Sequence, residues 1–137
     1  MSDRKYYAVM LVDDNEIDNL INQKMIEAAG ICDKIYLHAG AKSAIEFLKN
    51  VEKIADDLDK DILPSLIFLD IDMPLMDGFQ FLEQFNKLSM RTREFCNVVM
   101  LTSSINPQDV SKSENFTFVK KYLNKPLTQK MLTSLDF

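Results

Sequence analysis

The sequence has a single histidine and only two cysteines. Cys32 and Cys96 lie far apart, without a CxxC spacing and without a nearby histidine to complete a metal site, so we expect both to be reduced thiols. His38 has no chemical partner close to it in sequence, and we expect it to be structural or exposed. The sequence therefore offers no metal site made of thiolate or imidazole ligands.

A long apolar run is also missing. The first such run, residues 6–12, is followed at once by Asp13 and Asp14, which makes it too short and too quickly charged for a signal peptide or a membrane span. We therefore expect a cytoplasmic protein that neither crosses nor enters a membrane.

The chain lacks an excess of basic residues. Its net charge of −5 argues against a nucleic-acid partner, because nucleic-acid-binding domains usually carry a basic patch. The densest charge run, residues 56–61, is acidic and is expected to be a solvated helix end. The 137 residues, 47% hydrophobic and 27% charged, fit one globular domain over residues 1–137, with no output domain.

The stretch from residue 65 to residue 78 is the most informative part of the chain. Leu66 to Leu69 is a continuous apolar run between Pro64 and Pro74, and such a run suits a parallel strand that is covered on both faces. Asp70 lies at the carboxyl end of this predicted strand. In open α/β sheets ligands bind beyond those ends, so Asp70 is well placed for chemistry.

Strands and helices are expected to alternate along the rest of the chain. Further strands are predicted over residues 6–12, 34–39, 97–101 and 121–124. Helices are predicted over residues 16–29, from residue 40 with a continuation through residue 58, after the loop 74–78, from Pro107 and from Thr128. The first helix is expected to be amphipathic, with an apolar stripe of Ile17, Leu20, Ile21, Met25 and Ala28. Five alternations predict a doubly wound α/β sandwich with helices on both faces of the sheet.

Four of the predicted strands end on polar residues. These residues are Asp13 and Asp14, Asp70, Thr102, and Lys125, and in a parallel sheet they lie at one edge. Carboxylates a few ångströms apart repel by roughly 1 kcal/mol in water and about 4 kcal/mol at an effective dielectric of 20, so the cluster needs a cation. Oxygen ligands favour a hard ion, Mg2+ first. A metal, a lysine and a hydroxyl around one carboxylate suit phosphoryl transfer, with that carboxylate as the nucleophile.

In order and spacing, these motifs resemble the receiver domain of bacterial two-component response regulators, over almost the whole chain. The matching motifs are Asp13-Asp14, the run DIDMPLMDG from Asp70 to Gly78, Leu101-Thr102-Ser103, and Lys125-Pro126. The resemblance implies a stand-alone, chemotaxis-regulator-like receiver with a five-stranded flavodoxin-like sheet of order 2-1-3-4-5. It also implies a phosphorylation-dependent signalling switch that catalyses only its own phosphorylation and dephosphorylation.

The resemblance assigns the metal site and the phosphoacceptor. Asp70 would accept the phosphoryl group. Mg2+, or Mn2+, would be held directly by Asp14, largely through water by Asp13, and by Asp70 and the backbone carbonyl of Asp72. No other cofactor is implied.

The resemblance also assigns the residues around the phosphoryl group. Thr102 and Lys125 would contact it, and Tyr122, three residues before the lysine, falls at the aromatic switch position. Asp72 and Ser104 would flank the path of the attacking water and so tune the lifetime of the phosphorylated state.

A lone receiver has to signal through another protein or pass its phosphoryl group onward. We therefore expect a sensor histidine kinase or phosphotransfer protein and a downstream protein as partners. The alternative is a haloacid-dehalogenase-type phosphatase, whose Asp nucleophile is followed by an acid two residues on, as Asp70 is by Asp72. That family places the pair on the first strand and needs an acidic pair after the lysine, whereas only Asp136 follows Lys125. A receiver that works without phosphorylation is disfavoured because every expected site residue is present.

Overall fold

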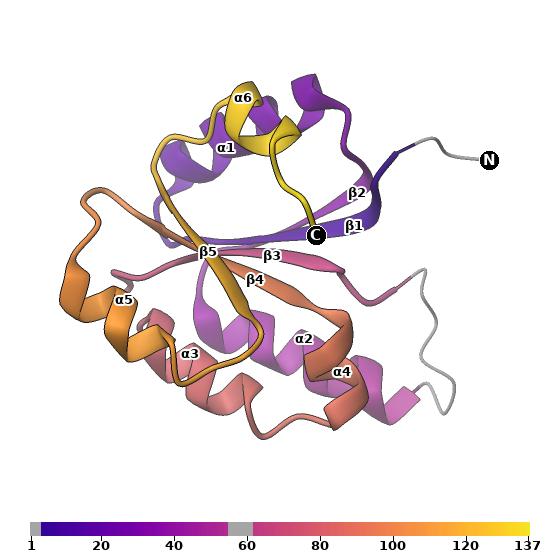
Figure 1. Cartoon of the computed structure of the whole chain (residues 1–137). Coiled ribbons are helices and arrows are strands. Elements are labelled where there is room, and N and C mark those ends of the chain that lie inside the picture. The colour runs from indigo at the N-terminus through magenta and orange to yellow at the C-terminus, as the bar shows by residue number, and fades with distance from the viewer. Residues whose placement is uncertain (1–3, 55–61) are drawn as a thin grey trace.

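The computed structural model describes residues 4–54 and 62–137 (Figure 1). Its elements are β1 (Tyr6–Val12), α1 (Glu16–Ala29), β2 (Cys32–His38), α2 (Ala41–Ile54), β3 (Leu66–Asp70), α3 (Gly78–Phe85), α4 (Met90–Phe95), β4 (Asn97–Thr102), α5 (Pro107–Ser113), β5 (Val119–Asn124) and α6 (Gln129–Thr133). The predicted continuation of the second helix beyond residue 54 and the acidic run 56–61 lie outside the described residues. Within the described ranges, no helix is both long enough and apolar enough to cross a membrane.

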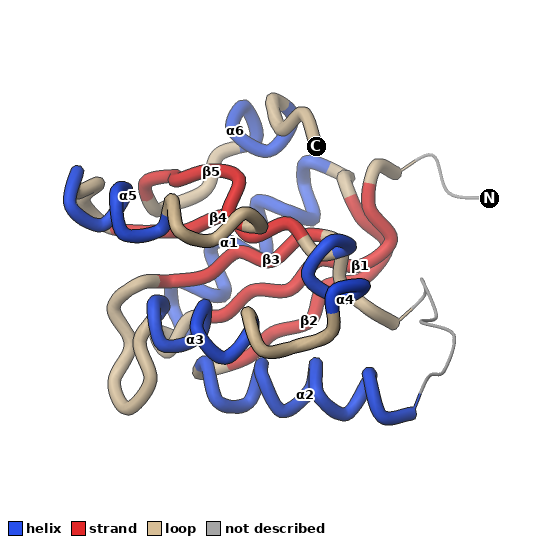
Figure 2. The backbone as a smooth tube through the Cα atoms, turned by 60° about the horizontal axis from the view of Figure 1, so that its bottom comes forward, coloured by secondary structure: helices blue, strands red, loops and turns tan. Residues whose placement is uncertain are grey.

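The five strands form one parallel sheet in the order β2-β1-β3-β4-β5, which confirms the predicted topology (Figure 2). Helices α1 and α6 cover one face, while α2, α3, α4 and α5 lie on the other (Figure 1). Because all strands run in the same direction, their carboxyl ends meet at one edge of the sheet.

Strand β3 is the centre of this sandwich, and all five of its residues are buried. Its side chains alternate between two hydrophobic clusters: Ile67 and Leu69 pack with residues of α2 and α3, and Leu66 and Phe68 pack on the side of α1 and α6. Full burial of each such side chain contributes about 1.5–3 kcal/mol. The apolar run thus holds Asp70 at a fixed place on the edge.

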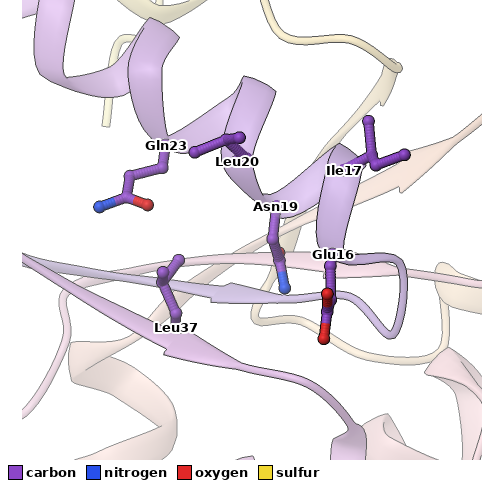
Figure 3. A pocket seen from close by; sticks show the side chains of 6 residues that line it. All are labelled: Glu16, Ile17, Asn19, Leu20, Gln23 and Leu37. Atoms are coloured by element: carbon purple, nitrogen blue, oxygen red, sulfur yellow. The ribbon is translucent and has the colours of Figure 1, made fainter.

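Helix α1 lies where it was predicted, capped by Asn15 and ended by Gly30 in the left-handed region (φ 63°). The expectation about its apolar stripe is wrong. Ile17, Leu20 and Ile21 are 68%, 54% and 41% exposed. The first two line an open groove against Leu37 of the edge strand β2, together with Glu16, Asn19 and Gln23 (Figure 3). The buried positions of α1 are Asn19, Asn22 and Ile26.

Helix α4 was not predicted. Its first turn is capped by Ser89 and also receives a carboxylate from α2: Glu52 Oε1 accepts hydrogen bonds from the Ser89 amide at 2.8 Å and the Thr92 hydroxyl at 2.7 Å. These contacts join residues that are 37 and 40 positions apart, so no local sequence pattern predicts them. They also hold the pKa of Glu52 below its ordinary value against the opposing effect of burial.

Two strands begin earlier than predicted because their first residues pair with residues of a neighbouring strand. Strand β2 starts at Cys32, which pairs with Tyr6, and β5 starts at Val119, which pairs with Val98. Strand β2 also ends one residue earlier than predicted, at His38.

The cysteines and the histidine have structural surroundings. Cys32 and Cys96 are free and buried, and burial raises the pKa of the Cys32 thiol to about 11. His38 Nδ1 lies 2.7 Å from Ser43 Oγ, and its ring is 5.6 Å from that of Phe47. His38 is therefore a packed residue of the β2–α2 region, as the sequence suggested.

Candidate functional site

Three carboxylates meet at the carboxyl edge of the sheet. Asp70 is the last residue of β3, and Asp13 and Asp14 directly follow β1. One oxygen from each lies within 4.8 Å of the others. Asp13 and Asp70 are buried while Asp14 is exposed, so the cluster opens to solvent on one side. Three carboxylates at this separation, two of them buried, are a donor set that fits a hard divalent cation.

Lys125 follows β5 and reaches into this cluster. Its Nζ lies 3.1 Å from Asp13 Oδ2, 3.2 Å from Asp70 Oδ1 and 2.9 Å from Asp18 Oδ2. Burial opposes the charge of the ammonium, but the hydrogen bonds to Asp18 and Asp13 outweigh it and hold the pKa of Lys125 above its usual value. Lys125 therefore stays protonated and neutralises part of the cluster.

The Asp70 carboxyl is poorly stabilised as an anion. Burial and then the neighbouring Asp13 raise its pKa to about 6, although Lys125 and the backbone amide of Asp72 act in the opposite direction. A cation beside Asp70 would remove this repulsion. An open polar pocket lies at this edge of the sheet. It is lined by Asp13, Asp14, Asn15, Asp18, Asp70, Asp72, Ser103 and Lys125.

Thr102 lies at the carboxyl edge of the sheet, as predicted, but its hydroxyl is hydrogen-bonded within its own loop. Thr102 is the last residue of β4 and is buried. Its hydroxyl donates to the Ser104 carbonyl at 3.0 Å and accepts from the Ser104 amide at 3.2 Å. The structure thus brings Asp13, Asp70 and Lys125 into contact, whereas the Thr102 hydroxyl is held in its own loop.

Tyr122, the predicted switch residue, is half-buried on β5. Its ring packs against the cluster on the α2 and α3 side of the sheet, and its hydroxyl donates to the carbonyl of Asp109 in α5 at 2.7 Å. Burial raises the pKa of the Tyr122 hydroxyl. The residue therefore links β5 to α5 directly.

Two asparagines of α1 position the site, and neither was predicted from the sequence. Asn19 Nδ2 donates to the Asp13 carbonyl at 2.8 Å, and Asn22 Oδ1 accepts from the Leu127 amide at 2.9 Å. Leaving such buried backbone groups without partners costs about 1–3 kcal/mol each. The side of α1 that faces the sheet is polar at these positions because it holds the loops that carry Asp13 and Lys125. The available signal was the spacing of Asn19, Asn22 and Ile26 on one helical face.

Gly78 allows the β3–α3 loop to fold back onto the end of β3. Its amide donates to the Ile71 carbonyl at 2.9 Å, and a Cβ at this position would lie 2.9 Å from the Asp70 carbonyl oxygen and 2.9 Å from Ile71 Cα. Directly before it, Asp77 caps α3 and exchanges hydrogen bonds with Gln80. The absence of a side chain at residue 78 thus fixes the path of the backbone beside Asp70.

The parallel sheet of order 2-1-3-4-5, with acids and a lysine at its carboxyl edge, defines a flavodoxin-like α/β protein with a candidate cation site. A model of the response regulator receiver domain family matches residues 9–135, and the chain belongs to this family. Receiver domains are signalling modules, normally without enzymatic activity, that pair with histidine kinases. The expectation of a single domain without an output domain stays a prediction.

Individual relatives agree with this family. The chain is 30% identical over 122 residues to the probable methanogenesis regulatory protein FilR2 of Methanothrix harundinacea (strain 6Ac), covering 89% of this chain and 74% of that protein. It is 28% identical over 131 residues to the sensor histidine kinase CheAY of Helicobacter pylori (strain ATCC 700392 / 26695), of which it spans only 14% while 94% of this chain is covered. A solved two-component response regulator from Cytophaga hutchinsonii is 30% identical, with a TM-score of 0.83, covering 95% of this chain and 93% of the other.

Proposed function

We propose that this protein is a phosphorylation-dependent switch in which Asp70 accepts one phosphoryl group from a sensor histidine kinase or phosphotransfer protein. The observation that carries the proposal is the Asp70 carboxylate, which is buried beside Asp13 and Lys125 but borders an open polar pocket. An acceptor there is shielded from bulk water yet accessible to a phosphodonor. Membership of the receiver family supports the same function.

In the proposed reaction, an Asp70 oxygen attacks the phosphorus atom, an O–P bond forms, and the bond from phosphorus to the donor atom breaks. Asp13, Asp14, Asp70 and the carbonyl of Asp72 would hold Mg2+ or Mn2+. When bound, the cation supplies charge neutralisation for the phosphoryl oxygens. Lys125 already lies 3.2 Å from Asp70 Oδ1 and would donate to one of those oxygens.

The Thr102 hydroxyl would also donate to the phosphoryl group, and to do so it has to leave the Ser104 backbone. Asp72 lines the pocket, and Ser104 is an exposed residue that follows Ser103, which also lines it. Both side chains would therefore affect the access of the water that hydrolyses the phosphoryl group. We propose that these two side chains tune the lifetime of the phosphorylated state.

The wild-type protein should gain one phosphoryl group when it is incubated with acetyl phosphate and Mg2+, and intact-mass spectrometry measures the gain. A chelator should prevent it, because three carboxylates without a cation repel an anionic donor. Continuous hydrolysis of a generic phosphate ester, with no phosphorylated protein, would contradict the switch and favour the dehalogenase-type phosphatase. The position of Asp70 on β3 rather than on β1 speaks against that alternative.

We also propose that the signal leaves through the surface of α5, β5 and α6, roughly residues 107–112, 121–122 and 129–131. The supporting contact is the hydrogen bond from Tyr122 to Asp109, which ties β5 to α5. Tyr122 is already half-buried in this structure, so an inward ring needs only a small shift of the population. Movement of Thr102 toward the phosphoryl group would bias that equilibrium by about 1–3 kcal/mol.

Beryllofluoride, a mimic of the phosphoryl group, should therefore perturb NMR chemical shifts of α5, β5 and α6 as well as the site loops. In Thr102→Ala the perturbations should remain at the sheet edge, because the hydroxyl that transmits the change is gone. A control is Thr133→Ala, whose hydroxyl only bonds within α6. Unchanged spread of the perturbations in Thr102→Ala would contradict this route.

A further inference from the structure

Asp18 is a contact of the site that the sequence motifs do not include. It lies in the first turn of α1, and its carboxylate approaches Lys125 more closely, at 2.9 Å, than Asp13 or Asp70 does. Its side chain is 34% exposed, whereas those of Asp13 and Asp70 are 2% and 4% exposed. Asp18 is also outside the group of three carboxylates that fits a cation.

Lys125 donates hydrogen bonds to Asp13 and Asp18, and the Asp70 carboxylate lies within ion-pair distance of the same ammonium. An ammonium has three N–H bonds and no further donor, and the structure places three carboxylates within 3.2 Å of Nζ. A phosphoryl group on Asp70 would draw the ammonium toward its own oxygens and away from one of these two hydrogen-bonded partners. Releasing buried Asp13 would leave an unpaired charge away from water, which is costly, whereas Asp18 can be rehydrated. Asp18 is therefore the partner that Lys125 gives up at least cost.

We propose that Asp18 is a positioning residue that holds the Lys125 ammonium and competes with the phosphoryl group for it. This inference rests on the proposed function, because it concerns the same phosphoacceptor site. Asp18 weakens the phosphorylated state relative to the unmodified one, since its own bond to Lys125 is lost on phosphorylation. Asp18 thereby affects how much of the protein a given concentration of phosphodonor converts to the phosphorylated state.

The backbone of Asp18 is fixed well enough for this role. Its amide donates to the capping side chain of Asn15 at 3.0 Å, and the next residue, Asn19, holds the carbonyl of Asp13. The competition is therefore decided at the side chains of Asp18 and Lys125 rather than by movement of the helix.

The test is the affinity of the Mg2+-loaded protein for beryllofluoride in Asp18→Asn. A partly exposed ion pair is worth about 0.2–1 kcal/mol, so the variant should bind beryllofluoride about 1.4- to fivefold more tightly than the wild type. The matched control is Glu16→Gln, which removes the same charge from the same helical turn but from a residue that lines the separate groove beside Leu37 (Figure 3). Asp18→Glu, which can rebuild the contact, should remain close to the wild type.

Two further measurements separate this role from a structural one. In a Lys125→Ala background, Asp18→Asn should no longer change the affinity, because Asp18 acts through the lysine. In metal-free protein, the Lys125 ammonium protons should exchange with water faster in Asp18→Asn than in Glu16→Gln, as NMR can measure. If the wild type binds no beryllofluoride, the proposed function is wrong and the inference with it. If the wild type binds and Asp18→Asn matches Glu16→Gln, the inference alone is wrong.

Discussion

Asp70→Asn is expected to accept no phosphoryl group and yet to unfold at a higher temperature than the wild type when no divalent cation is present. The loss of phosphorylation follows from the loss of the nucleophile. The gain in stability follows from burial and from Asp13, which together raise the pKa of Asp70 to about 6. Asparagine keeps the shape of the side chain without the charge, and the difference should be about 1–3 kcal/mol at neutral pH.

The stability gain has a defined pH dependence. An acid whose pKa is raised in the folded state contributes stability that is fully present below pH 3.8 and is lost as the pH rises through about 6. The wild type should therefore approach Asp70→Asn in stability as the pH falls toward 4. Mg2+ should stabilise the wild type more than the variant, because the three carboxylates are brought together only in the folded state.

Thermal melts across this pH range, with a chelator and with Mg2+, measure both effects. Glu46→Gln is the control, since it removes one negative charge from the exposed face of α2. A melting temperature of Asp70→Asn at or below that of the wild type, at neutral pH without metal, would show that Asp70 is not destabilised by its surroundings. Retained phosphorylation of the variant would show that the acceptor is another residue.

Gly78→Ala is expected to destabilise the protein by about 1–3 kcal/mol, because overpacking a rigid site costs that much. The added Cβ would lie 2.9 Å from two backbone atoms, the Asp70 oxygen and Ile71 Cα, and backbone cannot move aside as a flexible side chain can. The loop therefore has to shift, and the hydrogen bond from Gly78 to Ile71 weakens with it. The melting temperature should fall by roughly 3–10 °C.

Gly40→Ala provides a matched control in the same chain. A Cβ at residue 40 meets nothing within 4 Å, and its backbone does not need the left-handed region, so the substitution should be neutral or stabilising by up to about 1 kcal/mol. Chemical denaturation of the two variants gives the comparison. Equal stabilities would mean that the β3–α3 loop yields more easily than its geometry indicates.

The sheet could be predicted from the buried apolar runs in the sequence. The positions of most residues of the candidate site could then be predicted from the ends of those strands. A buried run such as Leu66 to Leu69 can be recognised locally, and the parallel arrangement then places Asp13, Asp70 and Lys125 together without further information. The prediction of the second and fifth strands was less accurate, since their first residues are ordered by pairing with β1 and β4 rather than by their own pattern.

The remaining features depend on contacts between distant residues. The exposed stripe of α1 could not be foreseen from hydrophobic spacing, because the helix turns Asn19 and Asn22 inward to satisfy backbone groups of two loops. Asp18 was missed for the same reason: its partner is 107 residues away in sequence. The spacing of residues along a helix shows which side chains share a face. Which face is buried depends on contacts with the rest of the fold.

Strand β3 is hydrogen-bonded on both sides and covered on both faces, and this has a consequence for the timescales of the molecule. Amides of such a strand exchange with solvent only when the whole domain opens, while loops exchange through small local openings. Asp70 thus belongs to the slowest part of the protein, and Asp14 and Ser103, which are exposed on loops, belong to a faster part. Asp70 therefore stays in place while the loop residues around it can rearrange many times between unfolding events.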